Sequence, residues 1–153
     1  MKIRRLEAED ATAARALIQA GLMERFKPYL EGYDPDLSDL LINHLEFLVG
    51  AIDGEIVATG GLKFEDARTV RVRRLSVAPT ARGQGLGALM LDALLHAARA
   101  RGFARAVLET GADWHSAIAL YERAGFERVK SSVEVDTGFH RLEFARDLIP
   151  HPQ

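Results

Sequence analysis

Apolar and polar residues alternate along several short segments of the chain, as they do in strands that bury one face. The alternation predicts strands at residues 3–6, 47–52, 55–64 and 70–77, and a turn at 65–68 between the last two. Asp53 and Gly54 separate the second and third strands, and an Asp-Gly pair at such a place is a strong hairpin signal. Further strands are predicted at 104–109, 126–135 and 139–144.

Helical spacing of apolar residues predicts four helices between these strands. Asp10 is expected to cap a helix at 11–20 that Gly21 ends, and a second helix is predicted at 36–43. The longest helix follows a glycine-rich stretch, runs to about residue 101 and has one apolar stripe. That stripe consists of Leu86, Met90, Leu94, Ala97 and Ala98. Asp113 is expected to cap the last helix, at 114–124, and Gly125 to close it.

Strands and helices occur in the order βαα-βββ-α-β-α-ββ. This order predicts an α/β fold with one mixed sheet and helices on both of its faces. At 153 residues, without repeats or linker-like segments, the chain is expected to form a single domain over 1–153.

The glycine-rich stretch Arg82-Gly83-Gln84-Gly85-Leu86-Gly87 lies between the strand at 70–77 and the longest helix. It is expected to form the first turn of that helix, where unpaired N–H groups and the helix dipole favour an anion. The spacing does not fit the dinucleotide fingerprint, and no Lys-Ser/Thr pair follows as in a P-loop. A nucleotide-like cofactor is therefore one interpretation, and a glycine-rich turn without a ligand is the other.

Two segments carry a resemblance to a known family. The run from Leu75 to Gly87 resembles the cofactor-binding motif of the GCN5-related N-acetyltransferases, Gln/Arg-x-x-Gly-x-Gly/Ala, through Arg82, Gly85 and Gly87. Residues 117–126 resemble that family's late helix and following strand. The resemblance implies a mostly antiparallel sheet of the acyl-CoA N-acyltransferase fold. It also implies acetyl-CoA as cosubstrate, its diphosphate on the N–H groups of residues 82–87.

Composition excludes several other chemistries. The chain has no cysteine, so disulfides, thiolate metal sites and an acetyl-cysteine intermediate are excluded. Five histidines show no paired ligand spacing, so no metal is expected. A net charge of −2 gives no sign of a nucleic-acid or membrane partner. Apolar runs too short for a bilayer and an N-terminus unlike a signal peptide favour a cytoplasmic protein.

Acetyl transfer to an amine needs a base for the amine, a donor for the developing oxyanion and an acid for the leaving thiolate. The resemblance implies Tyr121 as the acid and Glu109, twelve residues earlier, as the base. It further implies an oxyanion donor on the backbone near Leu75, Ser76 and Val77, where a bulge admits the pantetheine arm. A core tyrosine and a glutamate that bonds neighbouring backbone remain the alternatives.

The sequence departs from the family pattern at two positions. Arg71 stands where many relatives have an acidic residue, which gives Glu109 more weight as the base. Trp114 stands where an asparagine is usual, either as a packing change or with altered contacts to pantetheine. His115 is an alternative base of lower rank.

The acceptor is left open between a small-molecule amine and a protein N-terminus. Arg71 and Arg73 lie on one strand face and either pair with nearby charges or favour an acidic acceptor. Residues 26–36 are expected to form the acceptor-side wall, which either binds the acceptor or is only an aromatic-anchored surface loop. Candidate residues for it are Phe26, Tyr29, Tyr33 and His140.

These observations predict an N-acetyltransferase that moves the acetyl group of acetyl-CoA to a primary amine by direct attack in a ternary complex. The alternative from another class is a catalytically silent acyl-CoA-binding sensor or interaction module. A different acyl donor, such as succinyl-CoA, also stays open. Oligomeric state is undetermined, and the resemblance is compatible with a homodimer through the C-terminal strands.

Overall fold

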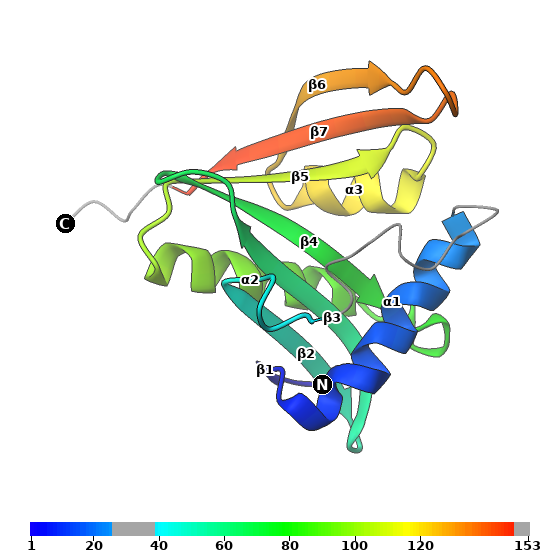
Figure 1. Cartoon of the computed structure of the whole chain (residues 1–153), viewed down its shortest axis with the longest axis vertical. Coiled ribbons are helices and arrows are strands. Elements are labelled where there is room, and N and C mark those ends of the chain that lie inside the picture. Colours follow the sequence, from blue (N-terminus) through cyan, green and yellow to red (C-terminus); the bar gives the residue numbers. More distant parts are fainter. Residues whose placement is uncertain (26–38, 149–153) are drawn as a thin grey trace.

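One twisted sheet organises the chain, of which a computed structural model describes residues 1–25 and 39–148 (Figure 1). Its strand order over these residues is β1-β2-β3-β4-β5-β7-β6, and every neighbouring pair is antiparallel except β4 with β5. The strands are β1 (Lys2–Arg5), β2 (Glu46–Ile52), β3 (Glu55–Phe64), β4 (Thr69–Val77), β5 (Arg105–Gly111), β6 (Glu127–Val133) and β7 (His140–Asp147). The predicted mixed, mostly antiparallel sheet is confirmed, and strand ends differ from prediction by a few residues.

Helices cover both faces of the sheet, as predicted. The helix α1 (Ala11–Arg25) packs its buried Ala14 and Ile18 against Phe47 and Val49 of β2. On the opposite face lie α2 (Leu86–Ala100) and α3 (His115–Arg123). Two short 3-10 helices, η1 (Ala8–Asp10) and η3 (Pro79–Ala81), precede α1 and α2.

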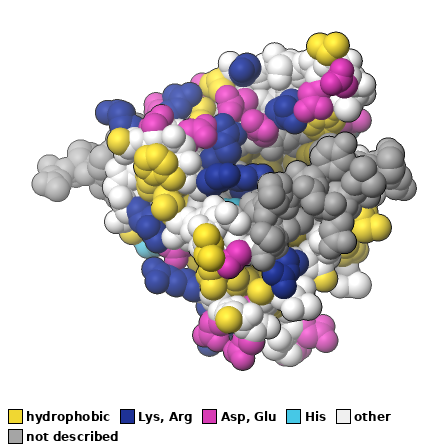
Figure 2. Space-filling view, viewed as in Figure 1, with side chains coloured by type: hydrophobic (Ala, Val, Ile, Leu, Met, Phe, Trp, Pro, Cys, Tyr) yellow, Lys and Arg dark blue, Asp and Glu magenta, His cyan; other side chains and the backbone are white. Residues whose placement is uncertain are grey.

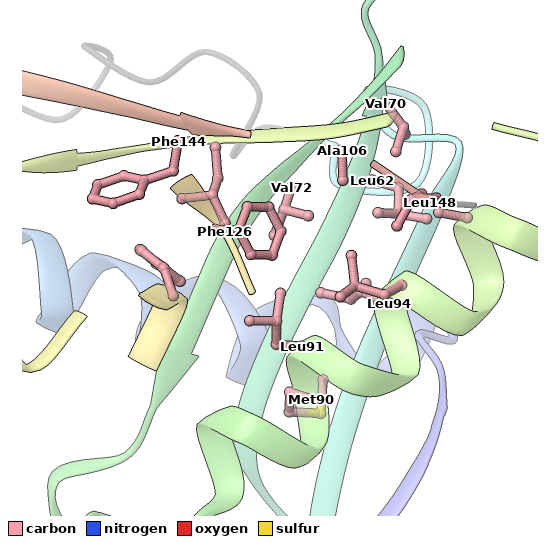
Figure 3. Close-up of a cluster of buried hydrophobic side chains, with 14 of the residues drawn as sticks. Leu62, Val70, Val72, Met90, Leu91, Leu94, Ala106, Phe126, Phe144 and Leu148 are labelled. Carbon is pink, nitrogen blue, oxygen red and sulfur yellow. The ribbon is translucent and has the colours of Figure 1, made fainter. Parts of the chain in front are cut away.

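The larger core lies between the sheet and α2 with α3 (Figure 3). Buried side chains of α2 form the predicted apolar stripe, widened by two leucines. They are Leu86, Met90, Leu91, Leu94, Leu95 and Ala98. Phe126 and Phe144 belong to the same core, where both rings lie close to that of Tyr121 of α3. Burying each of the larger side chains contributes about 1.5–3 kcal/mol, so this packing fixes α2 and α3 on the sheet.

Helix α1 corrects two predictions about helix ends. Gly21 does not end the helix, which continues to Arg25. Gly21 faces β4: a Cβ built on it would lie 3.8 Å from the Ser76 Oγ. This contact with the sheet supports the additional helical turn that ends at Arg25. Asp10 does not cap α1: it ends η1, where its Oδ2 accepts the N–H of Glu7 at 2.8 Å.

Two other helix predictions are wrong. The predicted helix at 36–43 is only a turn over its described part, where Asp39 Oδ1 accepts the N–H groups of Leu41 and Ile42. Residues 36–38 lie outside the described residues. Asp113 does not cap α3, because the N-cap position belongs to Trp114, which makes no side-chain capping bond.

Strands β4 and β5 diverge, and this divergence creates the site. They pair over Thr69–Arg71 and Arg105–Val107 and then separate, as Figure 1 shows. A bulge lies beyond that point: Arg74 has φ 56°, the β3–β4 register shifts between Thr59 and Gly61, and Thr59 Oγ1 donates to the Arg74 carbonyl at 2.7 Å. A bulge bends the strand and increases its twist, so β4 turns away from β5. The bulge was expected near Leu75, and it occurs one residue earlier.

Candidate active site

A cleft of about 440 Å³ lies where β4 and β5 separate. Its walls come from α1, β4, β5, α3 and β7, so residues far apart in the sequence meet there. Among the predicted site residues, seven line it: Leu75, Ser76, Val77, Arg82, Gly87, Glu109 and Tyr121. The remaining ones, Gly83, Gln84, Gly85 and Leu86, belong to the turn and first helical residue at one end of it.

The glycine-rich stretch forms a turn before α2 rather than the first turn of the helix. Gly85 is the N-cap, so of the predicted residues only Leu86 and Gly87 are helical. Gly83 and Gly85 have φ of 80° and 76°, a conformation that costs little only for glycine. A Cβ at either would meet no atom within 4 Å, so their backbone is open to a ligand. With no side-chain cap on α2, its first N–H groups remain donors for an anion.

Arg82 points from this turn to the end of α1. Its guanidinium donates to both carboxylate oxygens of Glu24 at 3.0 Å, and its Nε donates to the Val77 carbonyl at 3.2 Å. The hydrogen bonds to Glu24 raise the pKa of Arg82, and Arg82 in turn lowers the pKa of Glu24. The pair therefore links the turn before α2 to α1.

The edge of β4 offers backbone donors to the cleft. The N–H of Ala78 donates to Val57 of β3, and successive N–H groups of a strand point to opposite edges. The N–H groups of Val77 and Leu75 therefore face the cleft, and that of Ser76 faces β3. The Val77 carbonyl, bonded to Arg82, is on the same edge, which agrees with this alternation.

Tyr121 belongs both to the core and to the cleft. It is 8% exposed and its ring centroid lies 6.3 Å from that of Phe126 and 6.2 Å from that of Phe144. Burial raises the pKa of its phenol, and the positive charge of Arg25 opposes that rise. The phenol is therefore protonated at neutral pH and can donate a proton into the cleft.

Glu109 lies between two arginines. Its Oε1 is 3.3 Å from Nη1 of Arg71, and its Oε2 is 3.1 Å from Nε of Arg141. The side chain is 45% exposed, so water reaches the carboxylate. The two guanidinium groups fix the direction of the carboxylate at the cleft wall.

Arg71 is paired with carboxylates of the chain. It donates to Glu65 at 2.5 Å and to Glu143 at 2.7 Å, in addition to its ion pair with Glu109. Burial alone would lower the pKa of Arg71, but the hydrogen bonds to Glu65 and Glu143 raise it overall. Arg71 thus has the paired charges of the first interpretation, and it also lines the cleft together with Arg73.

Trp114 forms an aromatic wall that the sequence did not reveal. A Cβ on Gly111 would lie 2.6 Å from Trp114 Cε2, so the indole packs directly on the β5 backbone. Its ring centroid lies 5.6 Å from that of Phe139, and Arg25 Cζ lies 4.3 Å above the indole. Arg141 Cζ lies 5.4 Å from the Phe139 ring. No sequence signal connects Arg25 with Trp114, because they are brought together only by the sheet.

Thr110 is a further residue that the sequence analysis missed. It lines the cleft and is 3% exposed, and its Oγ1 has no hydrogen-bond partner within the described part of the chain. A buried hydroxyl without a partner is costly, so a polar group entering the cleft would satisfy it. The amides of a pantetheine arm have suitable donors and acceptors. Together with the open glycine turn, this fits coenzyme A.

The histidine candidates do not lie in the cleft wall. His115 is exposed at the first residue of α3. His140 bonds Ser131 of β6 through its Nε2. Phe26, Tyr29 and Tyr33 lie outside the described residues.

Residues 1–25 and 39–148 contain no group of three or more His, Asp or Glu residues arranged to bind a metal ion. Likewise, none of their helices has the length and apolar character needed to cross a bilayer.

Comparisons with known proteins identify the family and the fold. The model of the acetyltransferase (GNAT) family matches residues 8–126. An IAA acetyltransferase of Azospirillum brasilense is 32% identical over 127 residues, covering 78% of this chain and 82% of that protein. The yncA structure from Salmonella typhimurium, solved with acetyl-CoA, has a TM-score of 0.80 at 20% identity, covering 100% of this chain and 96% of that one. The ribosomal-protein-S18-alanine N-acetyltransferase of Escherichia coli has a TM-score of 0.79 at 23% identity over 99% and 96%.

Proposed function

The chain belongs to the acetyltransferase (GNAT) family as an acetyl-CoA-dependent N-acetyltransferase, and we propose that it acetylates a primary amine by direct attack within a ternary complex. The observation that carries this proposal is the composition of one cleft. The β4 edge, Glu109 and Tyr121 all line it, and the glycine turn lies at its end. These are the groups that the chemistry needs.

The cofactor would lie along β4. The N–H groups after Gly85 would bind its diphosphate, and Thr110 and the β4 edge would meet the pantetheine arm. When bound, acetyl-CoA supplies a thioester carbonyl as the electrophile and a thiol as the leaving group.

Each chain group then has one task. The N–H of Leu75 or Val77 donates to the carbonyl oxygen as negative charge develops there. Glu109 accepts the proton that the attacking amine loses, directly or through a water, while Arg71 and Arg141 orient its carboxylate. Tyr121 donates its proton to the departing sulfur and recovers one from solvent. Because the chain has no cysteine, no acetyl-cysteine precedes this attack.

The alternative of a silent sensor depended on the missing acidic residue at position 71. Arg71 instead pairs with Glu109, so the cleft retains a carboxylate beside the β4 edge. This arrangement supports catalysis over binding alone.

The acceptor class is supported only in outline by similar proteins. One relative is named an IAA acetyltransferase, and one structural neighbour acts on a ribosomal protein alanine. Both a small amine and a protein N-terminus therefore stay within the proposal. Succinyl-CoA remains to be compared with acetyl-CoA as donor.

The test measures coenzyme A release from acetyl-CoA with a panel of amines at several pH values. We expect turnover with at least one amine, and a loss of about 100-fold in kcat for Glu109→Gln, as for removal of a general base. Glu122→Gln, on the exposed side of α3, is the matched control and should behave like the native enzyme. Tight acetyl-CoA binding without turnover for every amine would contradict the proposal.

A further inference from the structure

The cleft is strongly basic. Among the described residues that line it, six are arginines and one, Glu109, is acidic. The arginines are Arg25, Arg71, Arg73, Arg74, Arg82 and Arg141. Figure 2 shows the Lys and Arg side chains gathered at the centre of this face, with acidic side chains beside them. A cleft lined by charges of one sign raises the local concentration of ligands with the opposite charge.

Carboxylates of the chain balance part of this charge. Among the described residues, ion pairs join Arg71 to Glu65, Glu109 and Glu143, Arg82 to Glu24, and Arg141 to Glu109 and Glu134. Arg73 and Arg74 also have interaction partners. The guanidinium groups of these arginines already interact within the chain, so none of them is the best candidate to bind a ligand.

Arg25 differs from these five arginines. Among described residues no carboxylate lies within ion-pair distance of it, and its guanidinium instead lies over the Trp114 indole at 4.3 Å. Stacking on an aromatic face fixes a guanidinium while its edge N–H groups stay available for a carboxylate or phosphate. Trp114 is itself fixed by Gly111 and Phe139, so Arg25 has a rigid support.

The position of Arg25 favours the acceptor over the cofactor diphosphate. Adjacent residues of a helix point in different directions. Glu24 points toward the turn before α2, where it accepts a hydrogen bond from Arg82. Arg25 points to Trp114 on the opposite wall, and its charge acts on the Tyr121 phenol. Arg25 therefore lines the part of the cleft next to Trp114, away from the pair of Glu24 and Arg82.

We propose that Arg25, supported by Trp114, binds an anionic group of the acceptor, so that the enzyme acetylates amines that also carry a carboxylate or a phosphate. This inference rests on the proposed N-acetyltransferase function. It assigns to Arg25, which the sequence did not single out, the role that the sequence-based hypothesis gave to Arg71 and Arg73.

The test compares kcat/KM within pairs of acceptors that share an amine and differ in charge. The pairs are phenylalanine with phenylalaninamide, glutamate with glutamine, and phosphoethanolamine with ethanolamine. We expect the more anionic member of at least one pair to be preferred by about tenfold or more, as for a charge-assisted hydrogen bond. The first two pairs test a carboxylate and the third a phosphate.

Variants assign the preference to Arg25. Arg25→Gln should reduce the ratio within the preferred pair to near one, and Arg25→Glu should reverse it. Trp114→Leu should reduce the ratio as well, because it removes the aromatic support. Arg128→Gln, an exposed arginine of β6 outside the cleft wall, should leave the ratio as in the native enzyme.

Two results would overturn this inference and leave the N-acetyltransferase function in place. One is turnover with equal rates within every pair. The other is a rise in the acetyl-CoA dissociation constant for Arg25→Gln together with an equal loss of kcat/KM for all acceptors. That result would mean that Arg25 binds the cofactor. If no amine at all is acetylated, the proposed function itself fails.

Discussion

At the scale of single residues, Tyr121 shows how packing and chemistry share one side chain. Its ring packs against Phe126 and Phe144, and the residue also lines the cleft. From the sequence alone, a core tyrosine and a proton donor are alternative interpretations of Tyr121. In the folded chain the two roles are compatible, because only the hydroxyl end needs to reach the cleft.

Tyr121→Phe tests the donor role without disturbing the core. The ring is retained, so we expect an unchanged melting temperature and a kcat reduced by about 10- to 100-fold, because the departing thiolate loses its acid. Steady-state assays of coenzyme A release, with thermal unfolding alongside, measure both. A kcat equal to that of the native enzyme would assign Tyr121 to packing alone.

The raised pKa of Tyr121 predicts how kcat depends on pH. Burial raises the pKa of Tyr121 above its usual value of about 10, so the acid form persists across and beyond the neutral range. The native rate should therefore show no loss from Tyr121 deprotonation below about pH 10. A pH–rate profile of kcat that falls at lower alkaline pH in the native enzyme, but not in Tyr121→Phe, would contradict this.

At the scale of elements, the turn before α2 depends on backbone conformations that glycine permits. Gly85→Ala places a Cβ at φ 76°, so we expect the free energy of unfolding to fall by about 1–2 kcal/mol and acetyl-CoA binding to weaken. Gly102→Ala is the matched control, since Gly102 has φ 87° at the other end of α2 and also has open space around it.

The control separates stability from binding. Denaturant unfolding and calorimetry should show that both variants lose stability and that only Gly85→Ala loses affinity for acetyl-CoA. Equal affinities would mean that the turn does not bind the diphosphate.

The link between α1 and this turn gives a second prediction at this scale. Glu24 and Arg82 are each about half exposed, so their ion pair contributes little to stability. The carboxylate of Glu24 nevertheless repels an anion bound at the turn before α2. Glu24→Gln should therefore tighten acetyl-CoA binding about twofold, the effect of one charge at roughly 10 Å in water. Calorimetry at low salt measures it, with the exposed Glu55→Gln as control. Weaker binding would instead show that Glu24 pre-orients Arg82 for the cofactor.

At the scale of the whole molecule, two hydrophobic cores lie on one sheet. An ion pair stabilises the N-terminal part of the chain. Asp10 is 8% exposed and accepts two hydrogen bonds from Arg4, at 2.6 and 3.0 Å. These bonds lower the pKa of Asp10 below its usual 3.8. Since the folded value is the lower one, the stabilisation is present above about pH 4 and is lost as pH falls through the folded pKa.

Asp10→Asn should therefore destabilise the protein at neutral pH and much less in acid. We expect the free energy of unfolding to fall by about 1.5–3 kcal/mol at pH 7, the range for a hydrogen bond to a charged group. Urea titrations at pH 7 and at pH 3 measure the difference, with the exposed Asp113→Asn as control. An equal loss at both pH values would show that the charge of Asp10 is not what stabilises this region.

Local pattern determined most of the elements of this protein. Alternation at 55–64 and the Asp53-Gly54 pair suffice for a hairpin, because side-chain direction and turn conformation depend on adjacent residues. The same holds for the apolar stripe of α2 and for the glycine turn before it. Helix ends were less well predicted: α1 passes Gly21 because contact with β4 outweighs the helix propensity of one glycine.

Only the tertiary structure decided how the cleft is built and charged. Motif resemblance singled out Glu109 and Tyr121, but the partners of Glu109 come from β4 and β7, and Arg25 reaches Trp114 from a helix some ninety residues earlier. Such contacts depend on where β4 leaves β5, and that depends on the twist of a whole sheet. A sequence pattern records which face a residue takes, whereas the distance between two charges on separate strands is fixed only when the strands are assembled.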